Sequence, residues 1–307
     1  MSARVSLLPL LSLLASSLCS GACDDSLKDV SLIEETRVLG ARVESSGDPS
    51  RGSPRPGEQA TLRLFVAAPS GAPHFSYTLS LCAVRLTNSG FPDCISAPFA
   101  SISRVDSTPE DALLDFRVPE DIDLEQTPHA FASGLLCPDS DSILAADGTA
   151  SCATGSGRRV AFEFAFGGVQ DSNRNPNFAD DAFLLDGQPW PANAQLSCAE
   201  GSLPEVPARS VHALSISLAD SEFEPLSQPT AVDPDRETLL VSPFSSAGQL
   251  EHGFLSLTAH TPAEQRRVAW VAPTLADGQP QLLRFYFVVR DARSGEDFAS
   301  RALCVVP

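Results

Sequence analysis

The feature that most constrains the fold is an alternation of apolar and polar residues with a period of two. It is clearest in residues 59–66 (QATLRLFV), 75–81 (FSYTLSL) and 160–166 (VAFEFAF). Successive side chains of a strand point to opposite faces, so each segment predicts a strand with one buried face. Turn-forming stretches such as 53–57 (SPRPG) and 69–73 (PSGAP) punctuate these segments, and no stretch of ten residues has a convincing helical period. The chain is therefore expected to be all-β and built from antiparallel sheets.

A loose internal repeat divides the chain into two modules. Each half contains a strand that ends in an aromatic residue, one further residue, Val or Ala, and Pro, at 116–119 (FRVP) and 270–273 (WVAP). At 307 residues, the chain exceeds the usual size of a single domain. We therefore predict two tandem immunoglobulin-like antiparallel β-sandwich domains at 37–168 and 195–307, joined by an interdomain loop at 169–194.

The N-terminus has the pattern of a secretory signal. An apolar run at 5–18 follows a basic residue, and the small residues 20–22 stand before Cys23. The run is shorter than the ~20 apolar residues of a membrane-spanning helix, which favours a signal peptide at 1–22. Its ending resembles the lipobox of bacterial lipoproteins, in which the cysteine is lipidated and becomes the first mature residue. That resemblance implies a lipid anchor on Cys23, and the acidic residues that follow predict a short tether over 23–36. Secretion without an anchor is the alternative.

Six cysteines beyond Cys23 are available for disulfides in an oxidising compartment. Six cysteines allow many connectivities, and the sequence alone does not choose among them. Local loops favour three pairs: Cys82 with Cys94, Cys137 with Cys152, and the remaining Cys198 with Cys304. No CxxC motif or histidine spacing typical of a zinc site occurs, so disulfides are preferred to metal-binding thiols.

The densest polar stretch is the segment between the two modules, 167–190. Its side chains offer, at alternate spacing, the oxygen ligands that calcium prefers. The candidate ligands are Asp171, Asn173, Asn175, Asp180 and Asp181. An EF-hand loop would need Gly at its sixth position and Glu at its twelfth, where this segment has Pro176 and Ala182. An interdomain turn closed by Asn and Asp side chains is therefore the alternative to a calcium site.

Motifs for catalysis or ligand contact are few. No G-x-S-x-G nucleophile elbow occurs, and the five histidines form no H-x-x-x-H pair. Trp270 lies in a repeated strand and is expected in the core. Trp190, between two prolines in the loop, is the best candidate for a ligand contact if it is exposed. The formal net charge of −18 makes nucleic acid an unsuitable partner.

Two stretches carry a family resemblance. Residues 285–305, after the WVAP segment, resemble the closing strands of bacterial immunoglobulin-like and PKD-like modules, and residues 56–71 resemble the second strand and turn of the same class. Together with the lipobox, they resemble uncharacterised lipoproteins of myxobacteria. The resemblance implies an exposed binding or scaffolding role, with no catalytic residues to carry over.

We therefore expect a non-enzymatic cell-envelope lipoprotein, held at the inner or outer membrane by its lipid anchor and either periplasmic or surface-exposed. It would serve binding, adhesion or scaffolding toward a protein or carbohydrate ligand. A carbohydrate- or calcium-binding module is one alternative. An extracellular hydrolase with a site assembled from dispersed residues is another.

Overall fold

The computed structural model describes residues 30–71, 73–85, 93–145, 149–168, 173–192, 197–198, 201, 203–226 and 235–307. Ser31–Pro307 form one compact unit. The described elements are strands and short 3-10 helices, so the predicted all-β class is confirmed. The predicted signal peptide and Cys23 lie outside the described residues. Within the described part of the chain, no helix has the length and apolar character needed to span a membrane.

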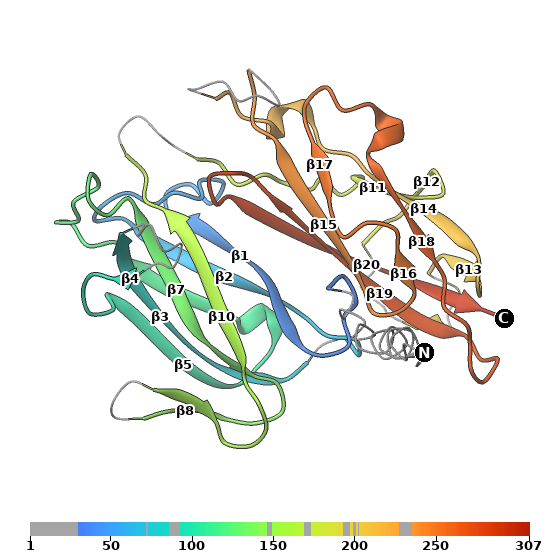
Figure 1. Ribbon diagram of the computed structural model, residues 1–307, viewed down its shortest axis with the longest axis horizontal. Coiled ribbons are helices and arrows are strands. Elements are labelled where there is room, and N and C mark those ends of the chain that lie inside the picture. The colour runs from blue at the N-terminus through green and yellow to red at the C-terminus, as the bar shows by residue number, and fades with distance from the viewer. Residues whose placement is uncertain are drawn as a thin grey trace, which may run out of the picture. The chain divides into compact units, whose positions relative to one another are not determined.

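The first sandwich packs a three-stranded sheet against a five-stranded sheet (Figure 1). The smaller sheet has the order β1–β2–β6, with β1 at Arg37–Ser45, β2 at Gln59–Ala67 and β6 at Leu113–Arg117. The larger sheet has the order β10–β7–β3–β4, with β5 also pairing with β3. Its strands are β3 (Phe75–Arg85), β4 (Asp93–Cys94), β5 (Ala100–Ser107), β7 (His129–Cys137) and β10 (Arg158–Ala165). A short hairpin of β8 (Ser142–Leu144) and β9 (Ala150–Cys152) and the 3-10 helix η1 (Pro109–Asp111) complete it.

The predicted alternation produces the core of this sandwich. Leu62 and Leu64 of β2 share one core with Leu79 and Leu81 of β3, and each is at most 1% exposed. Burying one such side chain stabilises the fold by ~1.5–3 kcal/mol. Tyr77 is buried among them, and its hydroxyl lies 2.9 Å from the Leu113 carbonyl oxygen, which ties β3 to β6.

The second sandwich packs two five-stranded sheets against each other. One has the order β12–β11–β14–β18–β16, from β11 (Phe183–Leu185), β12 (Gln188–Pro189), β14 (Val211–Ile216), β16 (Gln249–Leu250) and β18 (Arg267–Val271). The other has the order β13–β20–β19–β15–β17, from β13 (Glu205–Pro207), β15 (Leu239–Ser245), β17 (Leu255–Leu257), β19 (Gln281–Arg290) and β20 (Glu296–Val306). The 3-10 helices η3 (Asp220–Glu222) and η4 (Ala263–Gln265) lie in its loops. The pairing of β13 with β20 is parallel, which differs from the expected wholly antiparallel sheets.

The second sandwich begins earlier than predicted. Phe183–Leu185 and Gln188–Pro189, inside the segment expected as the interdomain loop, form a hairpin that adds to β14. Asp186 and Gly187 form its turn with φ of 51° and 79°, the left-handed backbone that an Asp-Gly hairpin turn requires. The apolar side chains of Phe183 and Leu185 are buried in the second core, and their burial holds the hairpin on the sheet.

The two sandwiches share a buried apolar contact. Ile33, Leu39, Ala67, Tyr286 and Val288 form a cluster of their own, joined by the partly buried Phe65, Phe244 and Phe298. The cluster therefore draws on the outer faces of β1 and β2 and on β15, β19 and β20 of the second sandwich. Ile33 is fully buried and its N–H donates to the Ser245 carbonyl oxygen over 2.8 Å. The last part of the predicted tether is thus packed on the second sandwich, because burying Ile33 removes its apolar surface from water.

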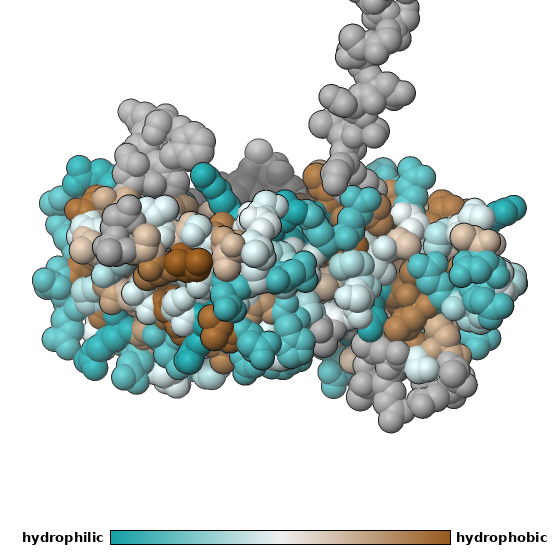
Figure 2. All heavy atoms as spheres, turned by 90° about the horizontal axis from the view of Figure 1, so that it is seen from below, coloured by the Kyte–Doolittle hydropathy of each residue, from teal (hydrophilic) through white to brown (hydrophobic). Residues whose placement is uncertain are grey.

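The surface is mixed in character. Figure 2 shows one face on which hydrophobic residues lie in small groups among hydrophilic ones. Among the described residues, the large hydrophobic side chains that are most exposed include Val211 at 66%, Val105 at 60% and Phe254 at 60%. Scattered exposed side chains of this kind are common on soluble domains and do not by themselves mark an interface.

Candidate functional site

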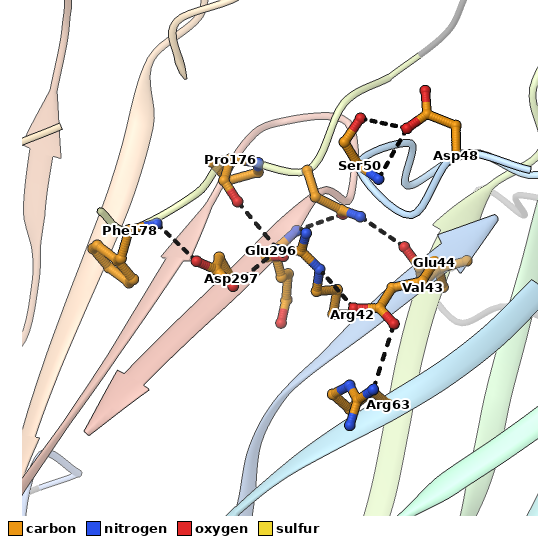
Figure 3. A network of polar contacts seen from close by, with 11 residues as sticks. Arg42, Val43, Glu44, Asp48, Ser50, Arg63, Pro176, Phe178, Glu296 and Asp297 are labelled. Carbon is orange, nitrogen blue, oxygen red and sulfur yellow. Dashed lines mark hydrogen bonds and ion pairs between the residues drawn. The ribbon is translucent and has the colours of Figure 1, made fainter. Parts of the chain in front are cut away.

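The contact between the two sandwiches carries a polar network (Figure 3). Arg42 of β1 donates through Nη1 to Asp297 Oδ1 of β20 over 2.8 Å, and its Nε lies 3.2 Å from Glu44 Oε1. Asp297 Oδ2 in turn accepts the Phe178 backbone N–H over 2.8 Å. Arg42 and Asp297 are largely buried, so solvent screens this pair less than a surface ion pair. The network fixes β1 against β20.

Glu296 lies at the centre of this contact and is 9% exposed. Its Oε2 accepts the Ala41 backbone N–H over 2.8 Å, and its Oε1 accepts from Arg290 Nε over 2.7 Å. Burial raises the pKa of the Glu296 carboxyl, although Arg290 acts in the opposite direction. A Cβ atom at position 40 would lie 2.4 Å from Glu296 Oε2, so only Gly40 lets β1 approach this carboxylate.

The predicted calcium ligands are not brought together by the structure. Asn175 donates through Nδ2 to the Val43 carbonyl oxygen over 2.7 Å, and Asn173 donates through Nδ2 to Asp291 Oδ2 over 2.9 Å. Both asparagines are buried between the sandwiches, whereas Asp180 and Asp181 are exposed. Asp171 lies outside the described residues.

No group of three or more His, Cys, Asp or Glu side chains in the described ranges is arranged to hold a metal ion. The observed role of Asn173 and Asn175 is to close the contact between the sandwiches, and calcium binding by this segment stays a prediction.

Trp190 is not an exposed contact residue. Its side chain is 1% exposed, its Nε1–H donates to the Ala302 carbonyl oxygen over 2.9 Å, and its ring packs edge-on to Phe285 with centroids 5.1 Å apart. The prediction that it contacts a ligand required exposure and is therefore wrong. The hairpin of β11 and β12 places Trp190 in the second core. A loop was predicted for this segment, so this burial was not predicted. Trp270, expected in the core, is fully buried.

The six cysteines form the three disulfides that the local loops favoured. They are Cys82–Cys94, Cys137–Cys152 and Cys198–Cys304, with sequence separations of 12, 15 and 106. Cys198–Cys304 connects the segment before β13 to β20, the last strand of the chain. Three disulfides indicate an oxidising environment, extracellular or periplasmic.

A pocket of about 250 Å³ opens between the sandwiches. Phe65 of β2 and Tyr286 of β19 line it, with ring centroids 5.8 Å apart. Ser300 of β20 lies opposite Tyr286 in the sheet and also lines it, and Glu110 of η1 adds an acidic group. The Tyr286 hydroxyl donates to the Ala68 carbonyl oxygen over 2.6 Å, which fixes the ring across the contact.

Arg284 and Arg301 both line this pocket. The guanidinium of Arg301 already donates to the Trp190, Ser300 and Asp180 carbonyl oxygens. The Nε of Arg284, in contrast, is buried without a hydrogen-bond partner among the residues that the structure describes. A Cβ atom at Gly71 would lie 2.4 Å from Arg284 Nη2, and the φ of Gly71 is 107°. Glycine at this position therefore leaves the room that the guanidinium occupies.

A second polar cluster escaped the sequence analysis. Ser210, His212 and Asp186 form a hydrogen-bonded chain on the sheet that contains β14. The sequence does lack a nucleophile elbow, but these three side chains come together without that motif. Two signals could have pointed to it: the serine and histidine stand two apart at the start of a strand, and the aspartate stands in an Asp-Gly turn.

Comparisons with known proteins leave the function open. No family model matches the chain, and no curated protein matches it. A nucleoside hydrolase-related hypothetical protein from Saccharophagus degradans aligns at 11% identity and TM-score 0.23, over 44% of this chain and 26% of that chain. The FN1–FN3 domains of chicken CNTN1 align at 8% identity and TM-score 0.21, over 90% and 69%. The D00–D0 domain of intimin aligns at 7% identity and TM-score 0.21, over 87% and 100%. Likenesses this weak carry no argument about activity.

Proposed function

We propose that the protein is a cell-envelope lipoprotein, anchored through Cys23, that has a non-catalytic binding role at the pocket between its two sandwiches. The lipobox resemblance and the three disulfides support the compartment. The buried contact between the sandwiches supports a pre-formed site, because small-molecule pockets are usually formed in advance and often lie between domains.

The observation that carries the binding role is the guanidinium of Arg284 in a pocket walled by Phe65 and Tyr286. A guanidinium matches the planar geometry of a carboxylate and binds it through two parallel hydrogen bonds. The aromatic rings offer a flat apolar wall, and the Ser300 hydroxyl offers a polar contact. The volume of about 250 Å³ lies below the ~300–1,000 Å³ of drug-sized sites. The ligand class is therefore a small molecule with one carboxylate, such as an acidic monosaccharide.

Calorimetry with galacturonate tests the ligand class. Arg284→Gln is expected to weaken galacturonate binding by ~10- to 100-fold, since a hydrogen bond to a charged group contributes ~1.5–3 kcal/mol. Arg117→Gln is the matched control, because Arg117 is exposed and pairs only with the neighbouring Glu120 among the residues described. Galactose, which lacks the carboxylate, should bind more weakly and without dependence on Arg284. Absence of galacturonate binding, or equal binding by Arg284→Gln, would contradict the proposal.

Fractionation of the native host tests the anchor separately. The mature wild-type protein should remain with the membranes and have the mass of a chain acylated at Cys23, whereas Cys23→Ala should appear in the soluble fraction. An unacylated mature chain with a different N-terminus would instead support simple secretion. Neither result depends on galacturonate, so the anchor and the ligand can fail independently.

A further inference from the structure

A chain of reactive side chains lies at the start of β14, away from the pocket between the sandwiches. Ser210 Oγ lies 2.5 Å from His212 Nε2, and His212 Nδ1 lies 2.6 Å from Asp186 Oδ2. The Ala213 backbone N–H donates to the other carboxylate oxygen of Asp186 over 2.8 Å. An alcohol, an imidazole and an oriented carboxylate therefore follow one another within hydrogen-bond distance. This order is the one that activates a serine for nucleophilic attack.

The backbone holds this chain in place. Ser210 immediately precedes β14 and His212 is the second residue of that strand, and the contact between Ser210 Oγ and His212 Nε2 joins the two side chains. Asp186 occupies the tight turn between β11 and β12, and its own N–H donates to the Ala213 carbonyl oxygen over 2.9 Å. The turn is thereby attached to β14 at the residue next to the histidine. The carboxylate cannot move away from the imidazole without breaking this pairing.

The side chains of this cluster differ in their exposure to solvent. The His212 side chain is 9% exposed, and its ring packs against Trp270 with centroids 6.0 Å apart. Ser210 is half-buried, so it is more accessible to solvent than His212. Burial acts to raise the pKa of Asp186, but the hydrogen bonds from His212 and Ala213 prevail and lower it. Asp186 therefore stays ionised and keeps the imidazole oriented.

A groove of about 400 Å³ adjoins this cluster and is lined by Asp186 and His212. Glu251 and Glu264 also line it, against one arginine, Arg267, so the net negative charge of the groove disfavours an anionic substrate.

We propose that Ser210 accepts acyl groups from neutral carboxylic esters, with His212 as the general base and Asp186 as the positioning residue. Ser210 Oγ forms a bond to the carbonyl carbon while its proton moves to His212 Nε2. The tetrahedral intermediate then breaks the bond to the leaving alcohol, which takes the proton from His212. Water repeats the two steps on the acyl-serine, so that a carboxylic acid leaves and the serine is regenerated. No oxidant, metal or further reactant enters this sequence.

The Ser210 hydroxyl has one proton and contacts both His212 Nε2 and the Pro207 carbonyl oxygen. The tautomer of His212 that carries its proton on Nδ1 donates to Asp186 and leaves Nε2 free to accept the serine proton.

The test uses the full mature chain with a fluorophosphonate probe and with p-nitrophenyl butyrate. We expect the probe to label Ser210, as located by peptide mass mapping, and Ser210→Ala to abolish both labelling and hydrolysis. His212→Gln should slow hydrolysis by ~10²- to 10⁴-fold, the usual contribution of general acid–base catalysis. Ser215→Ala on the same strand and His260→Gln, an exposed histidine outside the groove, are matched controls that should behave as the wild type.

A second variant keeps the proposal testable if His212→Gln does not fold. Ser210→Cys replaces the alcohol by a thiol, and a neighbouring imidazole should make its alkylation by iodoacetamide faster at neutral pH than that of a free cysteine. The native cysteines that the structure describes are all in disulfides, so the new thiol reports alone within this part of the chain. Absence of probe on Ser210, hydrolysis unchanged in Ser210→Ala, or ordinary alkylation of the new thiol would each overturn the proposal. Failure here leaves galacturonate binding at Arg284 unaffected.

Discussion

The two sandwiches reach the same architecture by different means. The first has a core of aliphatic side chains, phenylalanines and Tyr77, and both of its disulfides close short loops, with separations of 12 and 15 residues. The second contains both tryptophans of the chain in its core and is closed by one disulfide with a separation of 106 residues. The disulfides of the first module are thus local, whereas the disulfide of the second joins residues far apart in the sequence. If the contact between the sandwiches couples their unfolding, both will unfold together despite this difference. If it does not, they will unfold separately.

The largest expected effect is in the second core. Trp190→Ala should lower the free energy of unfolding by ~3–5 kcal/mol, because it leaves a cavity and removes the hydrogen bond to Ala302. Leu79→Ala in the first core should cost ~2–5 kcal/mol. Hydrogen exchange of β3 and β19 during urea unfolding would show whether either variant loosens both sandwiches together. Unfolding of one sandwich while the other stays protected would show that their contact does not couple them.

The disulfides should rank by the length of chain that they close. In the chain-entropy model, a loop of ~100 residues gives up to ~4.7 kcal/mol and a loop of ~15 residues gives ~3 kcal/mol, and measured values are often lower. Replacing Cys198 and Cys304 together by alanine should therefore lower stability more than replacing Cys137 and Cys152. Urea unfolding of the two double variants checks this order. The reverse order would mean that the first sandwich depends more on its covalent links than the second.

The smallest of the three effects is that of acidity, which should act in opposite directions on four buried carboxyls of the second sandwich and on Glu58 of the first. Burial raises the pKa of Glu237, Asp291, Glu296 and Asp297 in the second sandwich. The native state then holds protons that the unfolded chain has lost, so stability increases as the pH falls from neutral toward the unfolded value of ~4. In the first sandwich, the hydrogen bond from Arg51 lowers the pKa of Glu58. Its contribution is present above ~4.3 and is lost as the pH falls through the lowered value.

Urea unfolding at pH 7, 5 and 3 separates these contributions. Glu296→Gln should gain less stability than the wild type between pH 7 and 5, and Glu58→Gln should lose less between pH 5 and 3. An equal pH response in Glu296→Gln and the wild type would mean that this carboxyl is already neutral, or already hydrated, at the contact.

The strands of the first sandwich could be predicted from the sequence, because the alternation of apolar and polar residues is a local pattern. Residues 59–66 and 75–81 each place one apolar row on one face, and the structure buries that row. The segment after residue 168 failed as a loop prediction, because Phe183–Leu185 is too short for periodicity to reveal a strand. Its pairing with β14 is set by tertiary contacts, and that pairing also places Trp190, a candidate ligand contact only if exposed, in the core.

The candidate sites also differ in how far the sequence could predict them. Short loops were sufficient to favour two of the disulfides, and the third followed from the cysteines that remained. The pocket with Arg284 was not foreseeable, because it joins residues of β2 and β19 that are more than two hundred positions apart in the chain. The same holds for Asp186 and His212, which meet only because a hairpin turn is attached to the next strand.

The all-β class, the two modules and the favoured disulfide pairs could be predicted from the sequence, since these predictions depend on periodicity, turn residues and short loops. The buried contact between the modules, the hydrogen bonds of Asn173 and Asn175 across it, and the removal of charged groups from water depend on tertiary contacts. A strand pattern indicates which face is apolar but not what that face packs against. Burial, and with it every perturbed carboxyl and every pre-formed pocket, is a property of two surfaces together.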